Sequence, residues 1–306
     1  MAEPFLNYLR YEKRCSPHTL TAYQTDLAQF AAYLQSVYEM PQPETAGFPL
    51  IRSWIVSLVE AGHNATSVNR KIATLRTYYK FLLQRGSIVQ NPMLKVRTMK
   101  KSKPLPHFVE EQPLVQLLDT FAFPEGFTGL RDRLVLELLY GTGIRLAELL
   151  GINESDFSGH DNTLRITGKR NKQRVVPLNA SLLPLLESYQ QEKKRLFGTT
   201  ASTSLIVTDE GKAAYPVFVY RKVRKYITGI SQLKDANGYP LNLKVPEKRS
   251  PHVLRHTFAT HLLNRGADLN AIKDLLGHSS LAATQVYTHN SLDKLKKAYE
   301  QAHPKA

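Results

Sequence analysis

The sequence has few of the residues that build disulfide frameworks, metal clusters or membrane spans. Among its 306 residues Cys15 is the only cysteine, which excludes an intrachain disulfide and a cysteine-rich metal site. No apolar run reaches the roughly 18 to 20 residues of a membrane-spanning helix, and the start, MAEPFLNYLRYEKR, lacks the apolar core of a secretion signal. We therefore expect a cytoplasmic protein without a membrane span, in which Cys15 is a small, partly buried side chain.

Acidic residues are also scarce relative to basic ones. The sequence contains 41 Lys and Arg against 26 Asp and Glu, which gives a formal net charge of +15. Such an excess favours a polyanionic partner, and both nucleic acid and an anionic membrane surface fit it. The hydrophobic content of 42% is ordinary and is sufficient for one large domain or two smaller ones.

The first third of the sequence has the periodicity of amphipathic helices. Ser16 and Pro17 suit a helix start. After them, apolar residues recur every three to four positions at Leu20, Tyr23, Leu27, Phe30 and Leu34. A second stripe follows Asn64 at Val68, Ile72, Leu75, Tyr79 and Leu82. Cations on the other faces of this second helix form either a solvated or an anion-binding surface: Arg70, Lys71, Arg76 and Lys80.

The helical pattern ends at the basic stretch RTMKKSKPLP, residues 97–106. Its two prolines prevent a regular helix, and no acid balances Arg97, Lys100, Lys101 and Lys103. We expect one domain over residues 1–96, a linker over 97–106 and a second domain over 107–306. A linker of this charge is either a solubilised tether or a segment that lies along a phosphate backbone.

The second domain is expected to be mainly α-helical with one small β element. TLRITGKRNKQRVVPLN, residues 163–179, has two β-prone runs around a polar turn that carries Lys169 and Lys172. Helices are expected over residues 181–196, 215–228 and 268–276. Asp268 is predicted to cap the last of these and Gly277 to stop it.

Histidine and arginine are concentrated in PHVLRHTFATHL, residues 251–262. Helix geometry places His252, Arg255 and His256 on one side and His261 on the opposite side. The spacing of His252 and His256 matches a zinc pair, but the adjacent Arg255 cation opposes a dication. An anion site near the helix start is therefore favoured over a metal site, and purely structural histidines are the alternative.

A further arginine lies in GTGIRLAELLGI, residues 141–152, where glycines end one helix and Arg145 opens the next. Glu148 follows one turn later. This spacing suits a carboxylate that orients the guanidinium, and it equally suits a surface ion pair. The last motif, LLGHSSLAATQVYTH, carries His278 and Tyr287.

Four motifs, GTGIRLAELLGI, GKRNKQRVVPL, SPHVLRHTFATHLL and LLGHSSLAATQVYTH, resemble in order and spacing the motif set of the tyrosine recombinases, most closely the bacterial Xer branch. The resemblance covers essentially the whole sequence. It implies a site-specific recombinase that cuts and rejoins duplex DNA through a 3′-phosphotyrosyl intermediate, without a cofactor or a metal. The implied fold is a helical, SAM-like DNA-binding domain that closes over DNA, followed by a catalytic domain.

The resemblance implies that two arginines bind the reacting phosphate. Arg145 and Arg255 can give bidentate hydrogen bonds to its nonbridging oxygens and stabilise the transition state. His252 and His278 can donate to the same oxygens or exchange protons with the nucleophile, and which of them is the base stays open. Glu148 is expected to support Arg145.

The remaining implied roles concern the nucleophile and the leaving group. Tyr287 matches the nucleophile, whose phenolate must be favoured by a base and by nearby cations. Lys169 matches the lysine that protonates the departing 5′ oxygen, with Lys172 as the second candidate. His256 and His289 are expected to be structural.

The expected partner is double-stranded DNA with paired sites, on which a homo- or hetero-tetramer assembles at the nucleoid. DNA contacts are expected from Arg70, Lys71, Arg76, Lys80, Lys100, Lys101 and Lys172. The tetramer would form by exchange of C-terminal tails, in which Ser291 can cap a short helix with Leu292, Leu295 and Tyr299 on one stripe. Packing of the tail on its own domain is the alternative.

Chromosome dimer resolution is the expected role, and integration or transposition of a mobile element by the same chemistry is the alternative. Three other functions stay open: a type IB topoisomerase, a DNA-binding protein that has lost catalysis, and a metal-dependent nuclease. The complete residue set argues against lost catalysis. Relaxation of plasmids that lack a specific site would favour the topoisomerase, and full activity in EDTA would exclude the nuclease.

Overall fold

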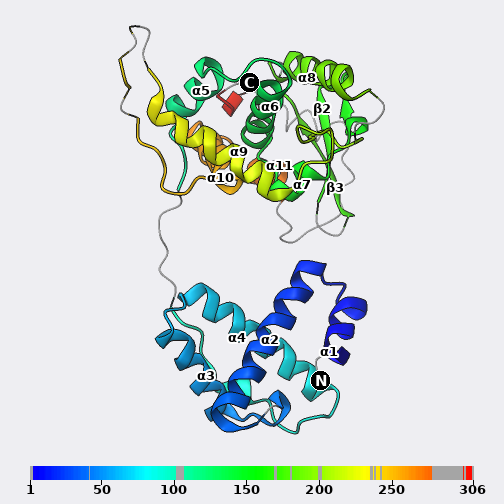
Figure 1. The fold of residues 1–306 in the computed structure, drawn as a ribbon, viewed down its shortest axis with the longest axis vertical. Helices are drawn as coiled ribbons and strands as arrows, with labels where there is room; N and C mark the ends of the chain where they lie inside the picture. Colours follow the sequence, from blue (N-terminus) through cyan, green and yellow to red (C-terminus); the bar gives the residue numbers. More distant parts are fainter. Residues whose placement is uncertain are drawn as a thin grey trace. The chain divides into compact units, whose positions relative to one another are not determined.

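The chain forms two compact units, Met1–Pro104 and Leu105–Ala306 (Figure 1), and each has its own hydrophobic core. The computed structural model describes residues 3–40, 42–100, 107–168, 171–179, 181–198, 202–234, 237, 239–241, 243–277, 299 and 301–304. The expected fold class is confirmed, because both units are mainly helical and a small sheet lies in the second. Within these ranges no helix is long and apolar enough to cross a membrane.

The first unit is a set of helices around an aromatic core. It contains α1 (Glu3–Asn7), the π-helical turn η1 (Tyr8–Glu12), α2 (Pro17–Tyr38), η2 (Pro43–Thr45), α3 (Phe48–Glu60), α4 (Ala65–Gln84) and η3 (Pro92–Lys95). The expected starts of α2 and α4 are confirmed, because the side chains of Ser16 and Asn64 each accept a backbone hydrogen bond in the first turn. Both expected apolar stripes pack into this core.

A buried carboxylate joins α2 to α4. Asp26 on α2 is fully buried and accepts hydrogen bonds from the Thr74 hydroxyl at 2.8 Å, from Lys71 Nζ at 3.1 Å and from the Arg70 guanidinium. The Lys71 ammonium also donates to Gln29, and the Lys71 side chain is only 5% exposed. Lys71 is therefore not one of the exposed cations expected on α4, because the buried acid draws it into the interface between the two helices. We call Asp26, Arg70, Lys71 and Thr74 the Asp26 cluster.

The chain that follows α4 is held against this helix. The Asn69 side chain donates to the carbonyl of Met99 at 2.9 Å and accepts from its amide at 2.8 Å, and Arg76 donates to the carbonyl of Val96 at 2.6 Å. The start of the basic stretch 97–106 is thus fixed to the first unit. Among the expected DNA contacts, Lys80 and Lys100 are exposed, whereas Lys101 lies outside the described residues.

The second unit packs helices around a small antiparallel sheet. Its elements are α5 (Glu111–Thr120), α6 (Phe127–Thr142), α7 (Leu146–Leu150), η4 (Glu154–Asp156), β1 (Phe157–Ser158), β2 (Thr163–Thr167), β3 (Gln173–Pro177), α8 (Leu182–Phe197), α9 (Pro216–Gly229), η7 (Ile230–Gln232), α10 (Pro251–Asn264) and α11 (Leu269–Leu276). The sheet order is β1-β2-β3. The expected hairpin is confirmed as β2 and β3. Strand β1 was not expected, because a strand of two residues is too short to show an alternation of apolar and polar residues.

Helix α6 runs through the core of this unit and positions the first arginine motif. Nearly all of its residues are buried, as expected for a helix that neighbours enclose on all sides. It ends at Gly143, whose φ is 61°, and a Cβ atom there would lie 2.4 Å from Cδ1 of Phe258 on α10. Glycine is therefore required both for the turn and for the close approach of α10.

The last described residues pack on the second unit itself. Tyr299 is 3% exposed, and the ring of His303 stacks on it at 4.7 Å and lies 5.0 Å from Tyr140 and 5.6 Å from Phe258. At this end of the chain the contacts thus match the alternative of packing on its own domain. Ser291, Leu292 and Leu295 lie outside the described residues.

Candidate active site

Arg145 and Glu148 form the first part of the site, at the start of α7. The Glu148 carboxylate accepts a hydrogen bond from the Arg145 amide at 2.9 Å and another from Arg145 Nη1 at 2.8 Å. The side chain of Glu148 is 4% exposed and that of Arg145 is 39% exposed. This buried carboxylate orients the guanidinium, which excludes the alternative of a surface ion pair.

Arg174 on β3 is the partner that sequence reasoning missed. Its Nη1 and Nη2 atoms bind the two oxygens of Glu148 at 3.1 and 2.8 Å, and its Nε donates to the carbonyl of Leu275 at 3.0 Å. The signal that could have revealed it is strand alternation, because Arg174 shares the buried face of β3 with Val176. An arginine on the apolar face of a strand needs a buried partner.

The Glu148 carboxylate is held firmly in its ionised form. Burial by itself raises the pKa of this group, but hydrogen bonds from Arg174 and from the Arg145 amide and side chain outweigh burial and lower the pKa to about 2. Glu148 is therefore an anion throughout the physiological pH range. It is suited to fixing cations and not to donating or accepting protons in a reaction near neutrality.

Arg255 reaches the same place from α10. The start of this helix lies where expected, after Ser250, although the Ser250 side chain makes no capping hydrogen bond. Arg255 donates from Nη1 to the carbonyl of Gly143 at 2.6 Å and from Nη2 to the carbonyl of Leu276 at 2.8 Å. Burial and the cations of Arg145 and Arg174 lower the pKa of Arg255 to about 10, with Glu148 partly offsetting them, so the group remains a cation at neutral pH.

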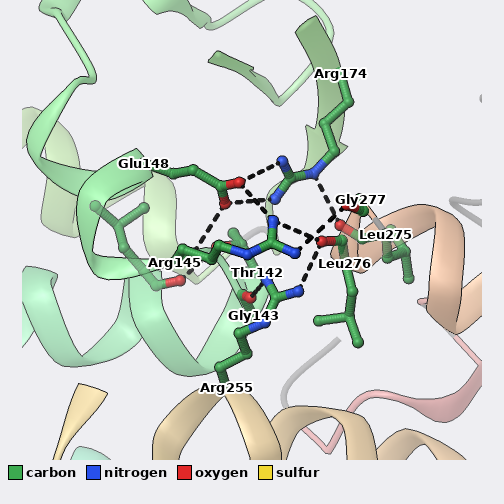
Figure 2. Close-up of polar contacts among 10 residues, drawn as sticks. Thr142, Gly143, Arg145, Glu148, Arg174, Arg255, Leu275, Leu276 and Gly277 are labelled. Carbon is green, nitrogen blue, oxygen red and sulfur yellow. Dashed lines mark hydrogen bonds and ion pairs between the residues drawn. The ribbon is translucent and has the colours of Figure 1, made fainter. Parts of the chain in front are cut away.

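The end of α11 supplies the neutral acceptors of the site. Asp268 caps the start of α11 as expected, and Gly277, at φ 63°, ends it. Figure 2 shows three guanidiniums meeting the carbonyls of this last turn. Arg145 Nη1 and Arg255 Nη2 both donate to the carbonyl oxygen of Leu276, at 3.4 and 2.8 Å, so donors from two separate helical segments converge on one oxygen atom.

We call Arg145, Glu148, Arg174 and Arg255 the arginine cluster. Three guanidiniums surround one carboxylate, so the cluster carries a net charge of +2. An excess of positive charge with convergent donors suits a phosphate whose negative charge grows during a reaction. In the described part of the chain, no group of three His, Cys, Asp or Glu side chains could hold a metal ion.

The three histidines of α10 lie on two sides of the helix, as expected. His252 and His256 are exposed, and His252 precedes Arg255 by one helical turn. His261 is buried, with Nδ1 at 3.0 Å from the Tyr140 hydroxyl and Nε2 at 2.9 Å from the carbonyl of Val109. Burial lowers the pKa of His261, which keeps the ring neutral and makes it a structural element of the core.

The described ends of the β2–β3 turn, Gly168 and Lys172, belong to the lysine motif, and Gly168 lies next to the arginine cluster. The amide of Gly168 donates to the carbonyl of Lys172 at 2.7 Å, and a Cβ atom on Gly168 would lie 3.3 Å from Oε1 of Glu148. The Lys172 side chain is exposed. Lys169, His278, His289 and Tyr287 lie outside the described residues.

Comparisons with known proteins identify the family of the chain. The phage integrase family matches residues 107–293, and the phage integrase N-terminal SAM-like domain matches residues 2–86. The tyrosine recombinase XerC of Chlorobaculum parvum is 36% identical over 329 residues, which cover 99% of this chain and 94% of the relative. The tyrosine recombinase XerC of Pelobacter propionicus is 38% identical over 305 residues, with coverages of 99% and 94%.

The fold is also similar to that of a solved recombinase. The crystal structure of the XerH site-specific recombinase bound to palindromic difH substrate superposes with a TM-score of 0.70 at 21% identity, over 97% of this chain and 82% of that chain. Two family models and relatives of matching length thus point to the same family. The chain belongs to the phage integrase family and is a tyrosine recombinase, an enzyme that cleaves and rejoins DNA strands.

Proposed function

We propose that the arginine cluster binds the scissile phosphate of a specific DNA site, with Arg145 and Arg255 as catalytic residues. The observation that carries this is the convergence of Arg145 and Arg255 on the carbonyl oxygen of Leu276. A phosphate oxygen in that position would receive the same two donors. Because a guanidinium is attracted more strongly to an anionic phosphate oxygen than to a neutral carbonyl oxygen, an anionic phosphate would displace the carbonyl.

The proposed reaction needs no metal and no cofactor. The Tyr287 oxygen attacks phosphorus, the bond from phosphorus to the 5′ oxygen breaks, and Lys169 gives its proton to that oxygen. The products are a 3′-phosphotyrosyl bond and a free 5′ hydroxyl, and attack by a 5′ hydroxyl of another strand reverses the step. His252 and His278 are proposed to donate to the phosphate or to take the proton of Tyr287.

Lys169 and Lys172 can be separated chemically. A DNA substrate with a 5′-bridging sulfur has a leaving group that needs no proton, so this substrate should restore cleavage by Lys169→Ala. Rescue of Lys172→Ala and not of Lys169→Ala would assign the proton to Lys172 instead.

The proposed biological role is chromosome dimer resolution in the cytoplasm, at the nucleoid. The support is the family together with relatives that are named XerC and match this chain over nearly its full length. Integration or transposition of a mobile element by the same chemistry is the second candidate, supported by a transposon integrase of similar fold, with a TM-score of 0.66.

One experiment tests both the chemistry and the role. Covalent protein–DNA adducts are recovered from cells that express the chain, and the ends of the attached DNA are sequenced. We expect one short paired site at a fixed chromosomal position. Adducts at the ends of a mobile element would favour the second candidate, and adducts without site preference, together with relaxation of any supercoiled plasmid, would assign a topoisomerase.

The first unit is proposed to close over DNA, with phosphate contacts from Arg70, Arg76, Lys80, Lys100 and Lys101 and a further contact from Lys172 in the second unit. Lys71 is assigned to the Asp26 cluster instead, because its ammonium is buried against Asp26 and Gln29. The side chain of Arg70 is 50% exposed, which leaves part of its guanidinium accessible to a phosphate.

We further propose that the enzyme works as a homo- or hetero-tetramer on paired sites, with C-terminal tails exchanged between subunits. Exchange would require Tyr299 and His303 to leave Tyr140 and Phe258 of their own unit. Cysteine cross-linking can test this exchange, because Cys15 is the only native cysteine and can be removed as Cys15→Ser. In that background, Tyr140→Cys and His303→Cys show whether the tail packs on its own chain or on another. Free protein should cross-link within one chain, and protein on two-site DNA should cross-link between chains. Intrachain cross-links in both states would contradict exchange.

A further inference from the structure

Arg174 has no assigned role in the proposed reaction, yet it is among the most constrained side chains of the site. Its side chain is 7% exposed, and three of its nitrogens make hydrogen bonds: two to the Glu148 carboxylate and one to the carbonyl of Leu275. A flat guanidinium with a bidentate partner and a third in-plane bond is held in one orientation.

Arg174 links three segments that each lead to a residue proposed to act on DNA. It belongs to β3, whose hairpin turn carries Lys169. It binds Glu148, which orients Arg145 through two further hydrogen bonds. It also binds the last turn of α11, where Gly277 directly precedes His278. No other described residue contacts both the Glu148 carboxylate and the Leu275 carbonyl by hydrogen bonds.

The packing around Arg174 leaves little room for adjustment. A Cβ atom on Gly277 would lie 3.0 Å from Arg174 Nη1, and one on Gly168 would lie 3.3 Å from Oε1 of Glu148, the oxygen that Arg174 Nη1 binds. Glycines therefore allow the backbone of the α11 terminus to approach the guanidinium and that of the hairpin turn to approach its carboxylate partner. A change at Arg174 alters the support of both segments at once.

Stability alone does not account for an arginine in this place. A buried ion pair is often no more stabilising than apolar side chains of similar volume, because both charges lose their hydration. An apolar residue on the buried face of β3 could fill the space but could not fix the carboxylate. The hydrogen bonds to Glu148 therefore indicate that Arg174 positions this carboxylate and does not only stabilise the fold.

We propose that Arg174 is a positioning residue, which acts through Glu148 and the end of α11 to fix Arg145 and the lysine hairpin for phosphate attack. This inference rests on the proposed function of the arginine cluster. Misplacement of a reacting group by about 1 Å can reduce a rate on the order of 100-fold. Loss of Arg174 is therefore expected to reduce the rate of cleavage strongly and DNA affinity little.

The test measures the rate of covalent adduct formation on a nicked duplex that carries the site recovered from cells. Arg174→Met is compared with the parent chain, with Arg174→Lys and with the matched control Arg165→Met. Arg165 lies on the neighbouring strand β2, is 51% exposed and forms an ion pair with Asp156. The control therefore removes one arginine from the same sheet without changing a residue of the arginine cluster.

We expect Arg174→Met to bind the duplex within about twofold of the parent and to form adduct on the order of 100-fold more slowly. Arg174→Lys should recover part of the rate, because an ammonium can keep one bond to Glu148. Glu148→Gln should also be slow. The double variant Glu148→Gln with Arg174→Met should form adduct no more slowly than the slower of the two single variants, because both changes break the same link between Glu148 and Arg174.

Three outcomes would overturn the inference while the proposed function stands. The first is a parent-like rate in Arg174→Met, and the second is a double variant whose loss of rate is the product of the two single losses. The third is a loss of rate in Arg174→Met that equals the loss of folded protein measured by circular dichroism. If Arg174→Met does not fold, the comparison of Arg174→Lys with Arg165→Lys decides in the same way. A parent chain that forms no adduct with any recovered DNA would overturn the proposed function and this inference together.

Discussion

Each of the two units buries a carboxylate among cations, but the cations of the two clusters differ in what else they bind. In the Asp26 cluster, the Lys71 ammonium donates hydrogen bonds to the side chains of Asp26 and Gln29. In the arginine cluster, Arg145 and Arg255 donate partly to neutral backbone carbonyls of Gly143, Leu276 and Gly277. A carbonyl is a weaker acceptor than an anion, so these donors can be transferred to a phosphate.

The comparison explains why similar residues serve different purposes in the two units. A buried cation that is neutralised by a nearby acid contributes to the fold, and its removal leaves an uncompensated charge. A cluster that keeps excess positive charge and exchangeable acceptors is available to a ligand. The net charge of the whole chain does not distinguish the two, because the formal charge of +15 counts buried and available cations alike.

The largest effect is expected when the exchangeable donors are removed. Arg145→Ala and Arg255→Ala should each reduce adduct formation about 100- to 1000-fold, because each removes donors aimed at the transition state. The matched control is Arg265→Ala, which follows the other end of α10 and pairs with Glu111 at the surface. Single-turnover kinetics on the nicked duplex measure the rates. A rate within a few-fold of the parent would remove Arg145 or Arg255 from the catalytic set.

Removing the acid of the Asp26 cluster should affect stability and not chemistry. Asp26→Asn leaves Lys71 buried without a charged partner, which is expected to lower the free energy of unfolding of the first unit by about 3 kcal/mol. Urea denaturation followed by the fluorescence of Trp54 measures it, since Trp54 is the sole tryptophan and lies in that core. An unchanged unfolding midpoint would show that Asp26 does not hold the two helices together.

The ionised Glu148 carboxylate of the arginine cluster should make the free energy of unfolding depend on pH. The pKa of Glu148 is about 2 in the folded chain against an ordinary 4.5, so its ionised form stabilises the fold above pH 4.5 and this contribution is lost as the pH falls toward 2. The full difference is on the order of 3 kcal/mol. Between pH 5 and pH 3 the free energy of unfolding should therefore fall less steeply in Glu148→Gln than in the parent. Equal slopes would contradict the strong pairing of Glu148.

The smallest effect is expected at the exposed cations of the first unit. Lys80→Ala should weaken binding to all DNA sequences and lower the slope of log affinity against log salt by about one. Lys71→Met should leave this slope unchanged, because its ammonium is already used inside the fold. Titrations at several salt concentrations compare the two. A reduced slope in Lys71→Met would mean that Lys71 is released from Asp26 on DNA.

The features of the fold that could be predicted are those that depend on local sequence. Ser16, Asn64 and Asp268 cap helices through contacts within a few residues, and the β2–β3 hairpin is a local pairing. The order and spacing of the family motifs placed Arg145 and Arg255 in one expected site, and the structure brings their side chains together at the carbonyl of Leu276. The two-residue strand β1 is too short to produce a pattern.

The features that could not be predicted depend on contacts between distant segments. Lys71 is buried because Asp26 lies on another helix, 45 residues away along the chain, and helical periodicity cannot report such a partner. Arg174 meets Leu275 across 101 residues. Both errors arise at buried charges, whose environment is decided by tertiary packing and not by the charge pattern of one element.

The most direct test of the whole account is to identify the residue that becomes attached to DNA. The parent chain is trapped on the nicked duplex, digested, and the DNA-linked peptide is mapped by mass spectrometry, with Tyr287→Phe as the matched control. We predict attachment at Tyr287, and for Tyr287→Phe we predict DNA binding near the parent level without any adduct. Attachment at a different residue, or an adduct that persists in Tyr287→Phe, would contradict it.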